Sequence, residues 1–265
     1  MVFFNSTKTY AAETGSISIG TSPQELSGLI YIAVGRGYFV ANGLNVTIKD
    51  YDSGSAAVDG MLNDEVNMSG TIEYVIVNNA FKGKNISSIG YISRGQSIYL
   101  IGRTDHSISN ISAFKGKKIG VTRNTASEFY LDRFLSLHGI DMQDVDLVDV
   151  KGSQSEDAII NGDVDAVITW QLYVNMAKDR LGNSIVIWQA QSGQPSYWNI
   201  VGKDDWIAAH PKLVNKFLKS IAMAEEFNNA HPDEAMAIVQ KKLNYTDTYM
   251  AAVWPDYQFS LGIDQ

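Results

Sequence analysis

Residues 161–171 read NGDVDAVITWQ, a polar stretch typical of a helix end followed by small apolar residues that stop at Trp170-Gln171. A similar stretch, NDEVNMSGTIE, occupies residues 63–73, and position 161 minus position 63 gives an offset of 98. The same offset relates further identical residues and pairs Gly54-Ser55 with Gly152-Ser153, Asp59 with Asp157, Val66 with Val164, and Thr71 with Thr169. The sequence therefore predicts one helix–strand unit that is built twice.

The first part of the chain alternates short strand-like segments with helical ones. Strands are expected at 16–21, 45–51 and 66–70, and helices from Leu26 to about Val40, at 55–64 and at 72–81. Gly43 is suited to the left-handed conformation that ends a helix. This βαβ rhythm predicts a mostly parallel sheet covered by helices.

A second sheet is expected in the middle of the chain. Strands at 85–94 and 97–103 precede the polar segment 104–116, which we predict to be the crossing between two lobes. The rhythm then restarts, with strands at 117–122, 145–150, 164–169, 184–191 and 197–203 and helices at 126–137 and 154–161. From Asp204 onward the pattern is almost wholly helical, with His-Pro helix starts at 210–211 and 231–232, and this tail is expected to return to the first lobe.

The composition excludes several classes of function. The chain has 265 residues, 45% of them hydrophobic, which is enough for one large domain or two lobes. Its net charge of -8, without a Lys/Arg cluster, argues against nucleic acid or an anionic membrane surface as a partner. With no Cys, disulfides, thiolate metal sites and Cys nucleophiles are excluded.

The sequence lacks the common catalytic, metal and nucleotide motifs. There is no G-x-S-x-G, H-E-x-x-H or P-loop, and Gly35-Arg36-Gly37 lies inside an expected helix without the dinucleotide-binding pattern. The four histidines lack ligand spacing and stand at positions 106, 138, 210 and 231. We therefore expect no enzyme activity, no metal and no cofactor.

Two features bear on location. The start, residues 1–15, has too short an apolar stretch for an intact secretion signal and reads as a clipped spacer, so a signal or anchor is expected to lie outside this sequence. Asn-x-Ser/Thr sequons, which also arise by chance, occur at Asn5, Asn45, Asn67, Asn85, Asn110 and Asn244. Their excess favours an exported protein.

Candidate ligand-binding residues lie where strands end and helices begin, because free backbone N–H groups and helix dipoles point there in parallel sheets. These residues are Thr21, Ser22, Ser53, Ser55, Thr71, Glu73, Thr122, Thr125, Ser127, Trp170, Gln171 and Trp198. We expect Thr125–Ser127, with Thr122, to hold an anionic end and Trp170 and Trp198 to cover an apolar or planar middle. If the solute is zwitterionic, Glu73 is expected to receive its amine.

Each candidate also has a purely structural explanation. The patterns Ser22-x-x-Glu25, Thr125-x-x-Glu128 and Ser153-x-x-Glu156 fit capping boxes, whose side chains satisfy free donors at helix starts. The tryptophans could belong to the core, and Glu73 could face water.

Several stretches together resemble a known family. They are LIYIAVGRGYFVANGLNVTIKDYDSGSAAVDGMLNDEVNMSGTIEY, FKGKKIGVTRNTASEFYLDRFL, DAIINGDVDAVITWQ, WIAAHPKLVNKFLKS and AHPDEAMAIV. In order and spacing they resemble the type II periplasmic solute-binding proteins of the nitrate, sulfonate, taurine and thiamine-precursor group. The similarity covers nearly the whole chain from Ser16 onward.

The resemblance implies an α/β fold of two lobes that close over a small solute. Lobe one would comprise residues 1–102 and 198–265, and lobe two residues 103–197. Relatives touch their ligand at the turns selected above. Those that import sulfonates use donors at helix ends, whereas those that bind pyrimidine precursors use aromatic walls, and this sequence offers both.

The resemblance also implies an extracytoplasmic, monomeric protein that delivers its solute to an ABC transporter permease and meets the membrane only through an anchor or partner. One alternative is the ligand-sensing extracellular domain of a membrane receptor with a downstream signalling domain. A third interpretation, an enzyme like the pyrimidine synthases of thiamine biosynthesis, is disfavoured because those enzymes carry a Cys-rich motif and this chain has no Cys.

Overall fold

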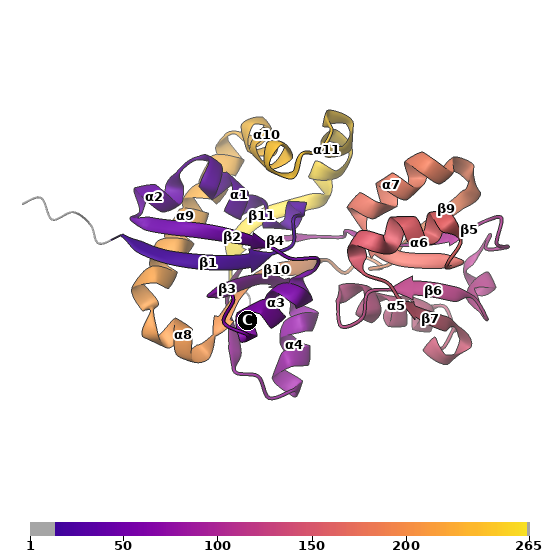
Figure 1. Ribbon diagram of the computed structural model, residues 1–265. Coiled ribbons are helices and arrows are strands. Elements are labelled where there is room, and N and C mark those ends of the chain that lie inside the picture. Colours follow the sequence, from indigo (N-terminus) through magenta and orange to yellow (C-terminus); the bar gives the residue numbers. More distant parts are fainter. Residues whose placement is uncertain (1–13, 264–265) are drawn as a thin grey trace, which may run out of the picture.

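A computed structural model describes residues 14–263, and the spacer expected at the start, with the Asn5 sequon, lies almost wholly outside them. The chain forms two lobes, each a sheet flanked by helices (Figure 1). The first sheet contains β1 (Gly15–Thr21), β2 (Leu44–Asp50), β3 (Met68–Ile72), β4 (Ile86–Gly95), β10 (Ser196–Lys203) and β11 (Tyr257–Gly262). The second contains β5 (Ile98–Arg103), β6 (Lys118–Val121), β7 (Asp146–Asp149), β8 (Ala166–Trp170) and β9 (Ile185–Gln189). The predicted two-lobed α/β fold is confirmed.

The repeat predicted from the sequence is present in both lobes. The strand orders are β11-β4-β10-β3-β1-β2 and β7-β6-β8-β5-β9. Strands β3 and β8, which run from 68 to 72 and from 166 to 170, are 98 positions apart. Each lies between one parallel neighbour, β1 or β6, and one antiparallel neighbour, β10 or β5. The two units therefore occupy equivalent places in their sheets.

The helices around these strands also correspond. Helices α3 (Gly54–Leu62) and α6 (Ser155–Asn161) precede the repeated strands, and α4 (Glu73–Phe81) and α7 (Gln171–Leu181) follow them without an intervening loop. The sequence pattern did not predict α7. Helix α5 (Ala126–Leu137) has the predicted bounds.

The predicted position of the crossing between the lobes is wrong. Strand β5 pairs with β8 and β9, so the second sheet already begins at Ile98, and the polar segment 104–116 lies within the second lobe. The chain crosses at 96–97 and returns at 190–195. We therefore propose that the lobes divide at these two segments instead of at 102 and 197.

One buried side chain joins the two crossing segments. Gln191 is fully buried, and its Oε1 accepts a hydrogen bond from Ile98 N at 3.0 Å. Its Nε2 donates toward three oxygens, namely Gly95 O at 3.3 Å, Gln194 O at 2.9 Å and Ser196 Oγ at 3.1 Å. The amide of Gln191 thus satisfies polar groups of both crossings at once.

The helix expected from Leu26 to Val40 is interrupted. It forms a 3-10 turn, Glu25–Ser27, then α1 (Gly28–Gly35) and α2 (Tyr38–Ala41). Gly37 has φ +70°, a left-handed conformation that stops α1, and Gly43 at φ +69° ends α2 as predicted. Residues Leu29–Ala33 are buried, which explains the apolar run in this stretch.

The tail returns to the first lobe, as predicted. It contains α8 (Asp204–Ala209), α9 (Pro211–Ala230), α10 (Pro232–Leu243) and α11 (Asp247–Val253), with Pro at the first position of α9 and α10. The tail is not helical to its end, because β11 follows and pairs antiparallel with β4. Within residues 14–263, no helix has both the length and the apolar content needed to cross a bilayer.

Candidate functional site

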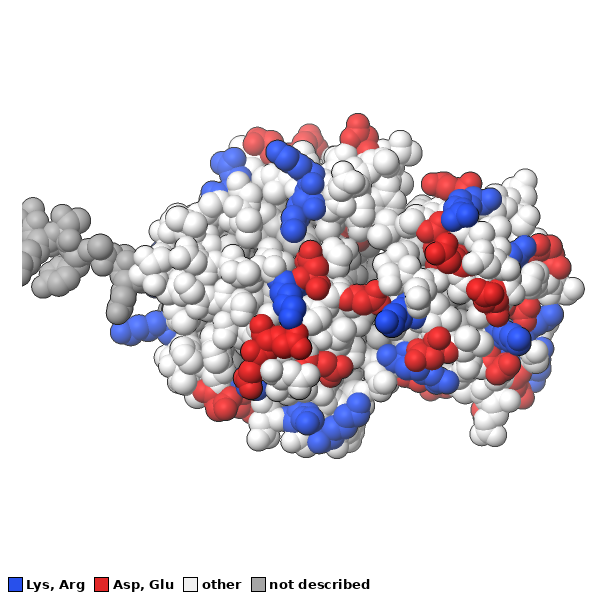
Figure 2. Space-filling view, in the orientation of Figure 1, with Lys and Arg blue, Asp and Glu red and all other residues white. Residues whose placement is uncertain are grey.

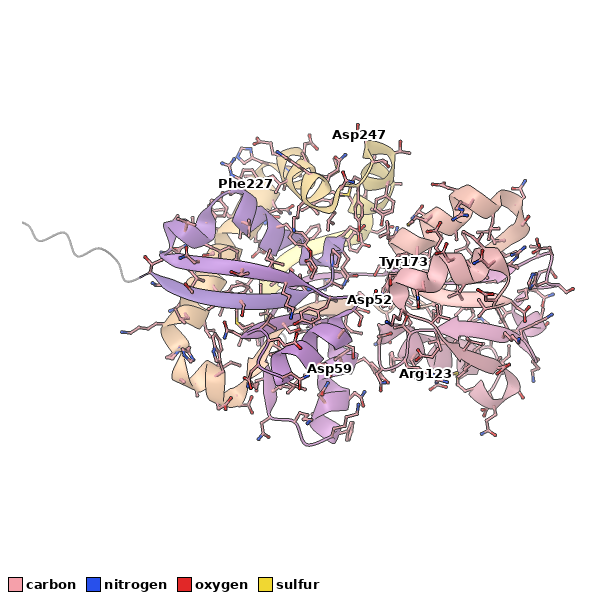
Figure 3. All side chains as sticks on the ribbon, viewed as in Figure 1. Asp52, Asp59, Arg123, Tyr173, Phe227 and Asp247 are labelled. Atoms are coloured by element: carbon pink, nitrogen blue, oxygen red, sulfur yellow. The ribbon has the colours of Figure 1, made fainter. Side chains whose placement is uncertain are left out.

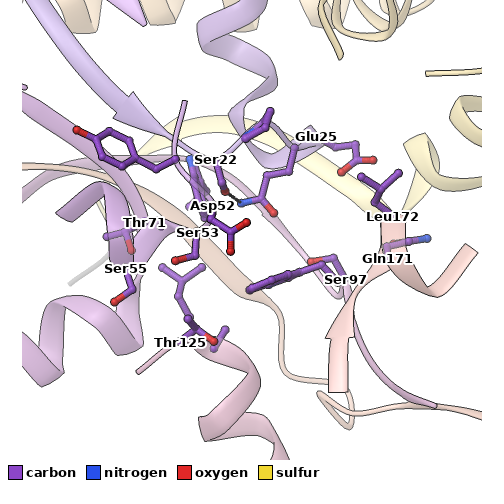
Figure 4. Close-up of a pocket in the computed structure, with 18 of the residues that line it drawn as sticks. Ser22, Glu25, Asp52, Ser53, Ser55, Thr71, Ser97, Thr125, Gln171 and Leu172 are labelled. Carbon is purple, nitrogen blue, oxygen red and sulfur yellow. Dashed lines mark hydrogen bonds between the residues drawn. The ribbon is translucent and has the colours of Figure 1, made fainter. Parts of the chain in front are cut away.

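A cavity of about 330 Å³ lies between the two lobes. All six strands of the two parallel β-α-β units end at it. In the first lobe, Ser22 follows β1, Asp52 and Ser53 follow β2, and Thr71 lies in β3. In the second lobe, Thr125 follows β6, Ser153 follows β7, and Trp170 is the last residue of β8. Figure 4 shows Ser53, Ser55 and Thr71 on one side of the cavity and Gln171 and Leu172 on the other. The carboxyl ends of parallel strands are the usual place for a ligand in such sheets.

Two tryptophans from opposite lobes line this cavity, and each lies against glycine. A methyl group on Gly152 would come within 2.1 Å of Trp170 Cζ3. A methyl group on Gly54 would lie 3.1 Å from Trp198 Cη2, and one on Gly70 would lie 2.6 Å from Trp198 Nε1. Gly54 and Gly152 are the glycines related by the 98-residue offset, so the repeat supplies space for one ring in each lobe.

Eight of the predicted site residues line the cavity. They are Ser22, Ser53, Ser55, Thr71, Thr125, Trp170, Gln171 and Trp198. Within this wall, Thr71 Oγ1 and Trp198 Nε1 are buried without a hydrogen-bond partner among the described residues. Thr169, the repeat counterpart of Thr71, instead bonds Ser155 Oγ at 2.7 Å. The wall of the cavity in the first lobe therefore contains polar atoms without a hydrogen-bond partner among the described residues, whereas the equivalent threonine of the second lobe has a partner within its own lobe.

The other four predicted residues do not line the cavity, because local partners or burial hold them elsewhere. Thr21 Oγ1 bonds Ser27 Oγ at 2.7 Å, and Thr122 Oγ1 donates to Val150 O at 2.8 Å. Glu73 Oε1 accepts from the backbone N of Tyr197 at 2.8 Å, and burial raises the pKa of this carboxyl. Ser127 is fully buried in α5. These contacts remove Glu73 as the expected partner for an amine in the cavity.

Only one of the three capping predictions holds in part. Thr125 Oγ1 accepts from Ser127 N at 3.2 Å and begins α5, while Glu128 accepts from Asn124 N at 2.7 Å instead of closing the box on Thr125. No side-chain cap forms at Ser22 or at Ser153. Ser22 Oγ instead accepts from Gln24 Nε2 at 2.9 Å.

Replacing Thr125 with alanine is expected to lower the free energy of unfolding by about 0.5–2 kcal/mol, because the cap of α5 is lost. Urea denaturation would measure this change. Ser153→Ala is the matched control, since Ser153 makes no cap bond and its loss should change stability by less than about 0.5 kcal/mol. Equal effects in the two variants would contradict the assignment of Thr125 as the cap.

The sequence patterns did not identify Glu25 as a cavity residue. Its side chain lines the cavity, and only 3% of the residue is exposed. Tyr249 Oη donates to Glu25 Oε1 at 2.5 Å, and Tyr257 Oη donates to Oε2 at 3.4 Å. Burial raises the pKa of Glu25 and of both phenols, so the tyrosines are neutral donors. The only sequence signal for Glu25 was its position just before an apolar helical stretch, and a glutamate at that position fits a capping box equally well.

The cavity lining is acidic. Glu25, Asp50 and Asp52 contribute carboxyl groups, and the described lining residues include no Lys, Arg or His. Asp52 lies at the junction of the lobes and faces Tyr173 of the second lobe (Figure 3). Elsewhere on the face shown in Figure 2, acidic and basic side chains are intermingled over both lobes without a basic patch.

A smaller cavity of about 250 Å³ adjoins the first and shares Ser53 and Ser55 with it. Lys82, Arg123 and Asp59 line this second space. Arg123 Nη1 lies 2.8 Å from Glu128 Oε1, so its charge already has a partner. Among residues 14–263, no group of three or more His, Cys, Asp or Glu side chains is arranged to hold a metal ion.

The sequence model of the family described as NMT1/THI5 like matches residues 26–235, which is most of the chain. The chain belongs to this family. A Haemophilus influenzae protein named for thiamine biosynthesis is 24% identical over 253 residues, which cover 93% of this chain and 80% of that protein. An aliphatic sulfonates-binding protein of Bacillus subtilis is 24% identical over 217 residues, which cover 80% of this chain and 65% of that protein.

The relatives of this chain also include a protein named as an enzyme. The 4-amino-5-hydroxymethyl-2-methylpyrimidine phosphate synthase of Aspergillus parasiticus is 25% identical over 222 residues, 78% of this chain and 64% of that protein. Among solved structures, the alkanesulfonate-binding protein SsuA of Xanthomonas axonopodis pv. citri, bound to MOPS, superposes with a TM-score of 0.82 at 13% identity. That superposition covers 96% of this chain and 89% of SsuA. It shows that the fold is that of the type II periplasmic binding proteins.

Proposed function

We propose that this protein is an extracytoplasmic solute-binding protein that captures a small organic solute and presents it to an ABC importer. The observation that carries this proposal is the cavity between the lobes, which Trp170 of the second lobe and Trp198 of the first, itself only 2% exposed, line from opposite sides. Clefts between two lobes, apolar with a few placed polar groups, are typical small-molecule sites. The names of the relatives, which include sulfonate-binding proteins, support the same role.

The aromatic lining favours a solute with a planar part. Indole rings bind flat π-systems with large contact areas, whereas a sulfonate needs several oriented donors. Of the donors expected for an anion, the Thr125 hydroxyl donates to Thr122 O at 2.7 Å, the Ser127 N–H donates to Thr125 Oγ1, and Ser127 lies outside the cavity lining. We therefore place a pyrimidine of the thiamine-precursor type ahead of an alkanesulfonate or taurine as the solute.

A calorimetric screen of aminopyrimidines, alkanesulfonates, taurine and carboxylates is expected to yield one class with saturable binding at a single site. Small-angle scattering should then show a smaller radius of gyration with that ligand, because the lobes close around it. A scattering profile that stays unchanged at demonstrated saturation would contradict closure. Absence of binding across all four classes would count against the proposed solutes.

An enzyme function is the second candidate, and the synthase among the relatives favours it. The cavity lining identified in the structure consists of carboxyl, hydroxyl, amide, aromatic and aliphatic groups and contributes neither a thiol nor an imidazole. We propose binding without catalysis. Formation of a pyrimidine phosphate by the purified protein would overturn that part of the proposal.

A further inference from the structure

We propose that the cavity selects an organic cation and that Glu25 is the carboxylate that receives its positive charge. This inference rests on the proposed solute-binding function and specifies the charge of the solute. It replaces the expectation of an anionic end at Thr125–Ser127 and moves the amine partner from Glu73 to Glu25. The geometry of Glu25 and the charges around it carry the inference.

Glu25 is held at the cavity wall with acceptor capacity left over. The residue follows β1 in the short turn Glu25–Ser27. Tyr249 donates one hydrogen bond to it, and the single O–H of Tyr257 lies 3.4 Å both from Glu25 Oε2 and from Gln171 Oε1. An ionised carboxylate has about four lone-pair positions on its two oxygens, so two phenols leave room for a further donor. Among the described residues, no Lys, Arg or His lies within 4.0 Å to pair with its charge.

A buried carboxylate without a cationic partner is costly in the empty protein. Transfer of a charge from water to a protein interior is unfavourable unless it is paired, and burial accordingly raises the pKa of Glu25. A cation that enters the cavity would provide the missing pair. Such a group, perturbed by burial and located in a cleft, is a recognised sign of a functional position.

The other charged side chains that line the cavity also favour a cation over an anion. Asp50 and Asp52 line the same space, and no basic side chain lines it among the residues described. An anionic solute would therefore meet like charges, which disfavour binding. In the adjoining space, Arg123 is paired with Glu128, and Asp59 and Lys82 contribute opposite charges to the lining.

The test compares three probes of different charge in calorimetry. The first is 4-amino-5-aminomethyl-2-methylpyrimidine, a cation at neutral pH; the second is its neutral hydroxymethyl analogue; the third is benzenesulfonate. The cation is expected to bind at least about tenfold more tightly than the neutral analogue, since charge-assisted hydrogen bonds are roughly twice as strong as neutral ones. Benzenesulfonate is expected not to bind.

Glu25→Gln is expected to remove the preference for the cation while leaving the neutral analogue within about twofold. Glu73→Gln is the matched control, because Glu73 is a partly buried glutamate whose pKa is also raised by burial but which does not line the cavity. It should retain the preference. Loss of the preference in Glu73→Gln and its retention in Glu25→Gln would show that the amine meets the other carboxylate and would overturn the proposal.

A second measurement needs no ligand. Glu25 has a folded-state pKa above its unfolded value, so the folded state binds the proton more tightly, and the ionised form lowers stability once the pH exceeds that pKa. At pH 7.5 we therefore expect Glu25→Gln to raise the melting temperature of the empty protein by roughly 2–4 °C. A lower melting temperature would mean that the carboxylate is a structural acceptor for Tyr249, and would overturn its assignment as an unpaired recognition group.

The outcomes separate this inference from the proposed function. Tight binding of benzenesulfonate with closure in scattering, unchanged in Glu25→Gln, would refute the charge assignment and leave the solute-binding function intact. Failure of every probe to bind, together with a lower melting temperature of Glu25→Gln, would contradict both.

Discussion

Replacement of Trp170 with alanine is expected to lower ligand affinity by roughly 10- to 100-fold, because stacking of a planar ligand on an aromatic side chain contributes about 1–3 kcal/mol. Trp170 ends β8 and supplies aromatic surface to the cavity from the second lobe. Titration calorimetry with the solute found in the screen would measure the change. The loss should appear mainly as a faster dissociation rate, since the contact forms only after the lobes close.

Trp206→Ala is the matched control for this experiment. Trp206 is a partly exposed tryptophan that stacks on His210 with ring centroids 4.7 Å apart, and it does not line the cavity. Its loss should leave affinity unchanged. Gly152→Ala provides a second check, because the added methyl group would collide with Trp170 and should weaken binding without removing the ring. Full affinity in Trp170→Ala would refute the aromatic wall.

Replacement of Gln191 with alanine is expected to lower the free energy of unfolding by about 3 kcal/mol, more than the loss of the Thr125 cap. The variant leaves the N–H of Ile98 without its acceptor and deprives Gly95 O and Ser196 Oγ of a donor. Each unsatisfied buried polar group costs about 1–3 kcal/mol. The melting temperature should fall by roughly 6–12 °C in thermal denaturation.

Gln194→Ala is the matched control, because it removes another glutamine side chain from the same crossing segment. Gln194 is exposed, and Gln191 Nε2 bonds only its backbone carbonyl. It should change stability by less than about 0.5 kcal/mol. Gln191→Glu keeps the shape of the side chain but replaces the donor Nε2 with an oxygen that faces oxygen acceptors and adds a buried carboxyl group, so it should also destabilise the protein. A Gln191→Ala protein as stable as the parent would show that the two crossing segments do not depend on this amide.

Much of the fold could be predicted because it depends on local patterns. The repeated strands, predicted at 66–70 and 164–169, are observed at 68–72 and 166–170 and consist mainly of apolar and small polar residues, which are compatible with buried strands. Helix starts at Pro211 and Pro232 follow from the geometry of proline itself. The 98-residue offset further indicated that the carboxyl ends of β3 and β8 are equivalent, and Thr71 and Trp170, which belong to those strand ends, both line the cavity.

Long-range pairing could not be predicted in the same way. Nothing within residues 98–103 distinguishes a last strand of the first sheet from a strand of the second, because either sheet buries the same apolar side chains. Pairing of β5 with β8 and β9 decides the matter and places the crossing at 96–97. Strand β11 was missed for the same reason, since its pairing with β4 lies far away in the sequence.

The sequence by itself therefore determined the two parallel α/β units and eight of the residues that line the cavity, because periodicity and turn chemistry act over a few residues. Only the tertiary structure decided the direction of the carboxylates. Glu25 and Glu73 both follow strand ends, yet the backbone of β10 binds Glu73, while two phenols from the C-terminal segment hold Glu25 at the cavity. Those partners lie far away in the chain, at separations of 124, 224 and 232 residues, so no local pattern could distinguish the two glutamates.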